Sequence, residues 1–158
     1  MYDIQVLGVK KGRMGDPGQL MGALAGGQLV GSIQKNRTQG VFGTVEKQST
    51  LEPLPVAETN QIREGEATIL STVDGTTTRE YSVEILKIYP NAHRTDRNML
   101  LKVTDPALLE ATGGIVQGMS GSPIIQDGKL IGAVTHVLVN DPTTGYGIFI
   151  ENMLDAAA

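Results

Sequence analysis

The run Gly118-Met119-Ser120-Gly121-Ser122-Pro123 holds the residue types best suited to a chemical reaction. Glycines two positions before a serine and one position after it allow the backbone angles of a tight turn. Such a turn can expose the Ser120 hydroxyl and direct backbone N–H groups toward one point, where they would stabilise the oxyanion of acyl transfer. The simpler alternative is a turn serine that bonds only its own backbone.

A serine hydroxyl is a weak nucleophile until a base lies within hydrogen-bond reach. The chain has two histidines, His93 and His136. A polar stretch surrounds His93, and a solvated loop explains it best. His136 follows the Ser120 turn in a predicted strand, where it could lie beside the serine or be a half-buried strand histidine bonded to a backbone carbonyl.

Composition narrows the remaining classes of function. With 158 residues, 40% hydrophobic and 19% charged, the chain is expected to fold as a single domain over residues 1–158. The net charge of −4 argues against a nucleic-acid partner. The lack of cysteine excludes disulfides and thiolate chemistry. Because no ligand cluster or phosphate-binding motif stands out, we expect neither a metal nor a cofactor.

Glycine and proline interrupt short apolar segments, a pattern typical of an all-β sandwich or barrel. Three hairpins are predicted: 19–25 with 28–34 around Gly26-Gly27, 66–73 with 77–89 around Asp74-Gly75, and 124–125 with 129–139 around Asp127-Gly128. Further strands are expected at 4–10, 41–46, 99–103 and 147–150, the last one followed only by a short tail. The start of the sequence shows no secretory signal, which leaves open that it is a piece of a longer chain.

One short helix is expected near 105–112. Asp105 suits its N-cap, Pro106 its first turn and Gly113 the position past its end.

The Ser120 segment resembles the nucleophile loop of chymotrypsin-like serine peptidases, usually Gly-Asp-Ser-Gly-Gly-Pro. With Gly132-Ala133-Val134-Thr135-His136-Val137 and residues 140–147, it is similar to the peptidase domain of the stage IV sporulation protein B family. The similarity extends back through residues 9–12 and 40–45. It covers nearly the whole chain, so a chance match is improbable.

This resemblance implies a chymotrypsin-like β-barrel, with the chain as the C-terminal portion of a peptidase domain truncated at its N-terminus. Ser120 would be the nucleophile, and the amides of Gly118 and Ser120 would form the oxyanion hole. Asp105 matches the acidic triad member by position, although helix capping explains it as well.

The family's general-base histidine precedes the region covered here, in a Gly-His motif that this sequence lacks. We therefore expect little activity from the chain alone. His136 matches the strand that lines the substrate groove, and it remains a candidate for the site.

The resemblance also implies a serine endopeptidase of sporulation signalling. It would be secreted into the space between mother cell and forespore and would cleave a membrane-anchored regulator to release sigma-factor processing. A PDZ domain would precede it in the parent chain. The alternative is a non-catalytic β-barrel that binds an extended peptide at a strand edge. Unpaired strand edges could also bring two copies together as a homo-oligomer.

Overall fold

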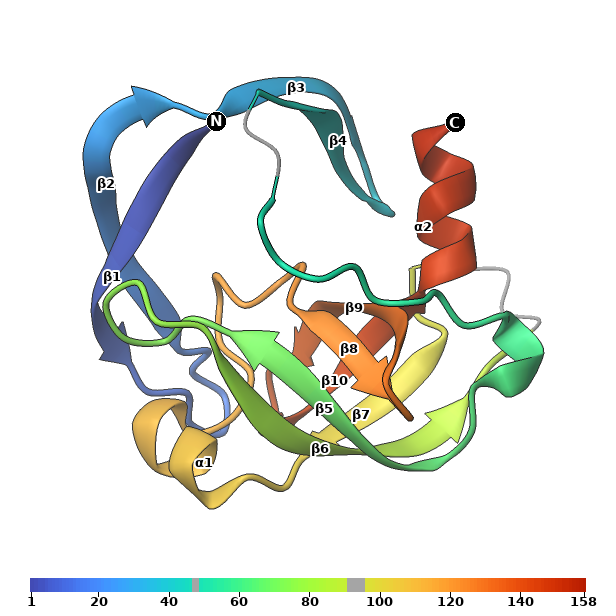
Figure 1. Ribbon diagram of the computed structural model, residues 1–158. Helices are drawn as coiled ribbons and strands as arrows, with labels where there is room; N and C mark the ends of the chain where they lie inside the picture. Colours follow the sequence, from blue (N-terminus) through green and yellow to red (C-terminus); the bar gives the residue numbers. More distant parts are fainter. Residues whose placement is uncertain (47–48, 91–95) are drawn as a thin grey trace.

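The computed structural model describes residues 1–46, 49–90 and 96–158. Six antiparallel strands form a closed barrel in the order β10-β7-β6-β5-β8-β9 (Figure 1). They are β5 (Gly65–Ser71), β6 (Arg79–Ile88), β7 (Met99–Val103), β8 (Pro123–Gln126), β9 (Lys129–Leu138) and β10 (Asp141–Phe149). Because closure pairs each barrel strand on both sides, the barrel leaves no free edge.

The side chains on one face of each barrel strand point inward and form the core. In β5 and β6 the buried residues alternate with exposed ones, as a pleated strand requires. The largest fully buried side chains include Ile69, Ile85, Leu101, Ile124 and Phe149. The expected all-β barrel is therefore confirmed.

The first 46 residues form two separate two-stranded ribbons. β1 (Tyr2–Lys10) pairs with β2 (Gln19–Leu29), and β3 (Gly31–Arg37) pairs with β4 (Gly40–Val45). The hairpin expected around Gly26-Gly27 is wrong, because β2 continues through both glycines and its register against β1 shifts there. Their φ angles of +74° and +65° serve a bulge in a bent strand, a conformation that glycine favours as much as a turn.

The other two hairpins are confirmed. β5 and β6 flank Asp74-Gly75, with Ile69 opposite Tyr81. β8 and β9 flank Asp127 and Gly128, both of which have positive φ angles, of 52° and 73°, as a tight two-residue turn demands.

The expected helix is α1 (Pro106–Thr112), capped by Asp105 and ended by Gly113 with φ +75°. A short 3-10 helix, η1 (Thr59–Gln61), lies in the connection to β5. The sequence failed to predict α2 (Ile150–Ala157), which occupies the region expected to be the end of a strand and a tail. Its N-cap, Phe149, has no side-chain acceptor, and the buried Asn98 Oδ1 accepts the Phe149 N–H instead. A contact so distant in sequence leaves no local signal. Among the described residues, neither helix has the length and apolar content to span a bilayer.

Candidate active site

Met119 holds the tight turn around Ser120 in place. The Met119 side chain is buried, its amide donates to the Val116 carbonyl at 3.1 Å, and its carbonyl accepts the Ser122 amide at 3.0 Å. Gly118 and Gly121, on either side, have φ angles of +100° and +90°, which only glycine adopts easily. Burial of Met119 and the two glycines together turn the next residue, Ser120, toward solvent.

The Ser120 hydroxyl donates to the Thr135 carbonyl on β9 at 3.1 Å. The Gly121 amide is bound to the Val134 carbonyl at 2.7 Å. In the described part of the chain, the amides of Gly118 and Ser120 donate to no protein acceptor. The turn therefore combines an exposed alcohol with two amides that are able to bind a developing oxyanion.

A cavity of about 440 Å³ opens beside Ser120. One wall is β9, including Thr135 and His136. The other wall comes from the β3–β4 ribbon, including Arg37 at the end of β3, and from Met153 of α2. The cavity thus lies between the barrel that carries the serine and a ribbon that does not belong to the barrel.

His136 lies on β9 opposite Tyr146 of β10 and lines the same cavity as Ser120. Its Nε2 is 3.9 Å from Oδ2 of the buried Asp96, an ion-pair distance longer than a hydrogen bond. The Thr135 hydroxyl, one residue earlier, lies 2.9 Å from the Asp96 carbonyl. A serine and a histidine thus line one cavity, with the aspartate beside the histidine, although the hydrogen bond of the Ser120 hydroxyl runs to a backbone carbonyl.

Asp105 is engaged at the start of α1. Its Oδ1 accepts the amides of Ala107 and Leu108 at 2.9 and 3.1 Å, and its Oδ2 accepts the amide of Ser82 at 3.2 Å. The helix-capping interpretation is confirmed. Asp105 does not line the Ser120 cavity, and its role as triad acid stays a prediction.

A family model for the SpoIVB peptidase S55 matches residues 1–154. This chain belongs to that peptidase family. The fold agrees with the assignment: the active form of the Rv3671c protease from M. tuberculosis superposes with a TM-score of 0.59 at 15% identity, over 96% of this chain and 76% of that one. A search of the curated proteins finds no match.

The sequence of this S55 peptidase did not indicate Asp96 as a residue near the site. Asp96 stands in a polar stretch with nothing local to distinguish it, and only strand pairing brings it to His136. The nearby contribution of Arg37 was equally invisible, since it depends on how the β3–β4 ribbon folds over. His93, the other histidine, lies outside the described residues.

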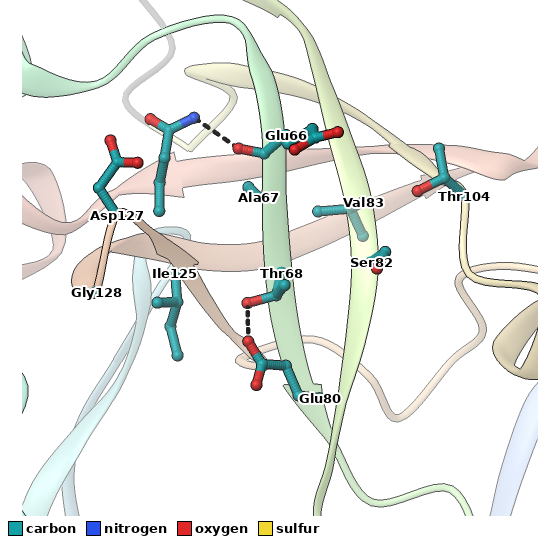
Figure 2. A pocket seen from close by; sticks show the side chains of 11 residues that line it. Glu66, Ala67, Thr68, Glu80, Ser82, Val83, Thr104, Ile125, Asp127 and Gly128 are labelled. Carbon is teal, nitrogen blue, oxygen red and sulfur yellow. Dashed lines mark hydrogen bonds between the residues drawn. The ribbon is translucent and has the colours of Figure 1, made fainter.

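A second cavity, of about 410 Å³, lies on the outer face of β5, β6 and β8 (Figure 2). Carboxylates of Glu66, Glu80 and Asp127 line it, and Glu80 accepts the Thr68 hydroxyl at 2.7 Å. It shares no lining residue with the Ser120 cavity. Among the described residues, no cluster of three or more potential ligands could hold a metal. This acidic surface is therefore separate from the chemistry proposed for Ser120.

Proposed function

We propose that this chain carries the nucleophile of a serine endopeptidase. The observation that carries the proposal is the exposed Ser120 hydroxyl on a turn whose Gly118 and Ser120 amides have no acceptor among the described residues. A general base takes the Ser120 hydroxyl proton while Oγ attacks the scissile carbonyl carbon, and the two amides stabilise the resulting oxyanion. Collapse breaks the C–N bond as the base gives that proton to the departing amine, and water then cleaves the acyl ester, which releases the carboxylic acid and restores the Ser120 hydroxyl.

The general base is the part of this mechanism that the described residues do not place in a hydrogen bond with Ser120. Ser120 donates to the Thr135 carbonyl, which cannot take its proton. In the proposal the base is the histidine that precedes this region in the family, and the 440 Å³ cavity beside Ser120 has space for an imidazole. His136, with Asp96 behind it, supports the site or contacts substrate.

Labelling with a fluorescent fluorophosphonate tests both parts. We expect slow labelling that disappears in Ser120→Ala and is unchanged in His136→Ala, because the base is absent from the reaction. Rapid labelling that His136→Ala abolishes would make His136 the general base and overturn the idea of a missing one. Folding of each variant is checked by circular dichroism.

The proposed cellular role follows the family. The enzyme would be secreted to the space between mother cell and forespore and would cleave a membrane-anchored regulator, releasing sigma-factor processing, with a PDZ domain in the parent chain assisting recognition. The family assignment supports this role. The parent gene should restore sigma-factor processing to an endospore former that lacks its own protease, and Ser120→Ala in that gene should not.

The Ser120–Thr135 bond also suits a second candidate, a non-catalytic module that binds peptides. In such a module Ser120→Ala would leave peptide affinity unchanged. A peptidase complemented with its N-terminal segment would lose turnover on the same substitution.

A further inference from the structure

An apolar groove borders the Ser120 turn, and His136 does not line it. Its volume is about 780 Å³, and it runs between the β1–β2 ribbon and the end of β5, in the region where these elements face each other in Figure 1. Its apolar lining comes from Ile4, Val6, Leu20, Leu51 and Leu70, and it reaches Gly118. The groove therefore reaches the residue that supplies one of the two amides of the proposed oxyanion hole.

Two of these apolar side chains are left in water. Ile4 is 61% exposed and Leu51 is 81% exposed. One exposed apolar residue is ordinary, but two around one groove indicate a surface that binds a partner. Asp3 is the one charged residue in the described lining, so an acidic ligand side chain would lose hydration there and meet a like charge.

The groove and the Ser120 cavity share no residue and flank the same turn. Gly118 contributes to the groove, whereas Ser120 and Gly121 contribute to the cavity. An extended polypeptide with its scissile carbonyl at Ser120 leaves the turn in two directions, advancing roughly 3.3 Å per residue. One flank meets the cavity with Arg37 and His136, and the other meets the apolar groove.

We propose that this groove is the subsite for an uncharged, apolar, extended segment of the polypeptide substrate, on one side of the scissile bond. The position of that segment relative to the cleaved bond rests on the proposed function of Ser120. Its preference for apolar side chains rests on the groove alone. The specificity of the enzyme would then be strongest for substrates with an aliphatic stretch beside the cleavage point.

Binding is measured on the Ser120→Ala variant, so that turnover plays no part. The probes are two fluorescein-labelled peptides, Gly-Val-Leu-Ala-Val-Gly-Lys and Gly-Asp-Ser-Ala-Asp-Gly-Lys, followed by fluorescence anisotropy. We expect the aliphatic probe to bind more tightly. Adding Ile4→Asp or Leu51→Asp should weaken it by about tenfold, because a carboxylate replaces an apolar contact.

The matched control is Leu7→Asp on the same strand. Leu7 is 65% exposed, close to the 61% of Ile4, but it does not line the groove. It should leave binding of the aliphatic probe unchanged. Circular dichroism and thermal unfolding verify that all three variants fold, which their exposed positions favour.

Three results would overturn the proposal: tighter binding of the acidic probe, equal weakening by Leu7→Asp, or a dimer in sedimentation that Ile4→Asp dissolves and the aliphatic probe fails to displace. The last result would make a second copy of the chain the occupant. Failure of the fluorophosphonate to label Ser120, with the preference for the aliphatic probe intact, would refute the peptidase mechanism and leave the groove as a peptide site.

Discussion

The closed barrel and the two N-terminal ribbons differ in how they are held together. Within residues 1–46, Val6 is the one buried hydrophobic side chain, whereas β5 to β10 contribute most of the core. The barrel can thus fold around its own apolar interior, and the ribbons take their order from contacts with it. Both cavities beside the Ser120 turn nevertheless have a ribbon as one wall. We infer that the barrel fixes the nucleophile and the ribbons shape what reaches it.

The largest effect should come from deleting core volume in the barrel. Ile69 is fully buried in β5, and Ile33 on β3 is 55% exposed. Ile69→Ala should lower the free energy of unfolding by about 2–5 kcal/mol, and Ile33→Ala by well under about 1 kcal/mol. Urea unfolding measures both. Similar losses for the two variants would mean that Ile33 contributes to stability as a core residue does, and would contradict the contrast between ribbon and barrel.

A smaller loss is expected where ribbon and turn touch. In Gly118→Ala the new Cβ would lie 3.1 Å from the Leu20 Cβ, at a φ of +100° that alanine rarely adopts. We expect a cost of about 1–3 kcal/mol and a strong drop in fluorophosphonate labelling. Gly121→Ala is the matched control, because its φ is +90° but nothing lies within 4 Å of the new Cβ. If both cost the same, the contact with the ribbon contributes nothing.

Substitutions at Asp105 distinguish a structural role of this residue from a catalytic one. Asp105→Ala removes the acceptor for two helix amides and should destabilise the barrel by about 1 kcal/mol, whereas Asp105→Asn keeps the capping oxygen, loses only the acceptor for the Ser82 amide and should cost less. Thermal unfolding and labelling of Ser120 are measured together. Loss of labelling in a stable Asp105→Asn variant would support the triad role that the resemblance implies.

The smallest effect is a pH dependence at the β9–β10 turn. The side-chain hydrogen bonds from Thr143 and then Thr144 lower the pKa of Asp141 below its ordinary 3.8. A lowered carboxyl pKa stabilises the fold fully above the ordinary value, and the contribution is lost as the pH falls through the lower, folded value. The protection factors for hydrogen exchange in β9 and β10, which are corrected for the intrinsic pH dependence of exchange, should therefore fall below about pH 4, following the reference carboxyl pKa. Asp141→Asn should reduce that fall, and an unchanged profile would contradict the assignment.

The hairpin turns of the barrel and the ends of α1 could be predicted from the sequence, because neighbouring residues in the chain determine them. Asp127-Gly128 specifies a tight turn by its own backbone, and Asp105 with Gly113 delimits α1 without help from other elements. Residue spacing likewise indicated the Ser120 turn. The pair Gly26-Gly27 misled because positive φ angles suit a bulge as well as a hairpin.

What the sequence left hidden depends on tertiary contacts. α2 is held by Asn98 at its start and by Lys35 at its end, where the Lys35 ammonium donates to the carbonyls of Ala157 and Ala158. Asp96 meets His136 only because the strand carrying His136 passes the segment before β7. Such long-range partners have no periodicity or spacing to indicate them.

Gln117 connects the β1–β2 ribbon to the Ser120 turn through its backbone. The backbone amide of Gln117 donates to the Gly18 carbonyl, and the backbone carbonyl of Gln117 accepts the Leu20 amide, both at 2.9 Å. Gln117 directly precedes Gly118, so any displacement of β2 pulls on the peptide that presents the first oxyanion amide. The position of β2 therefore affects the Ser120 turn. A ligand or neighbouring segment that holds β2 in place also holds the Gly118 amide in position, and one that displaces β2 also displaces that amide.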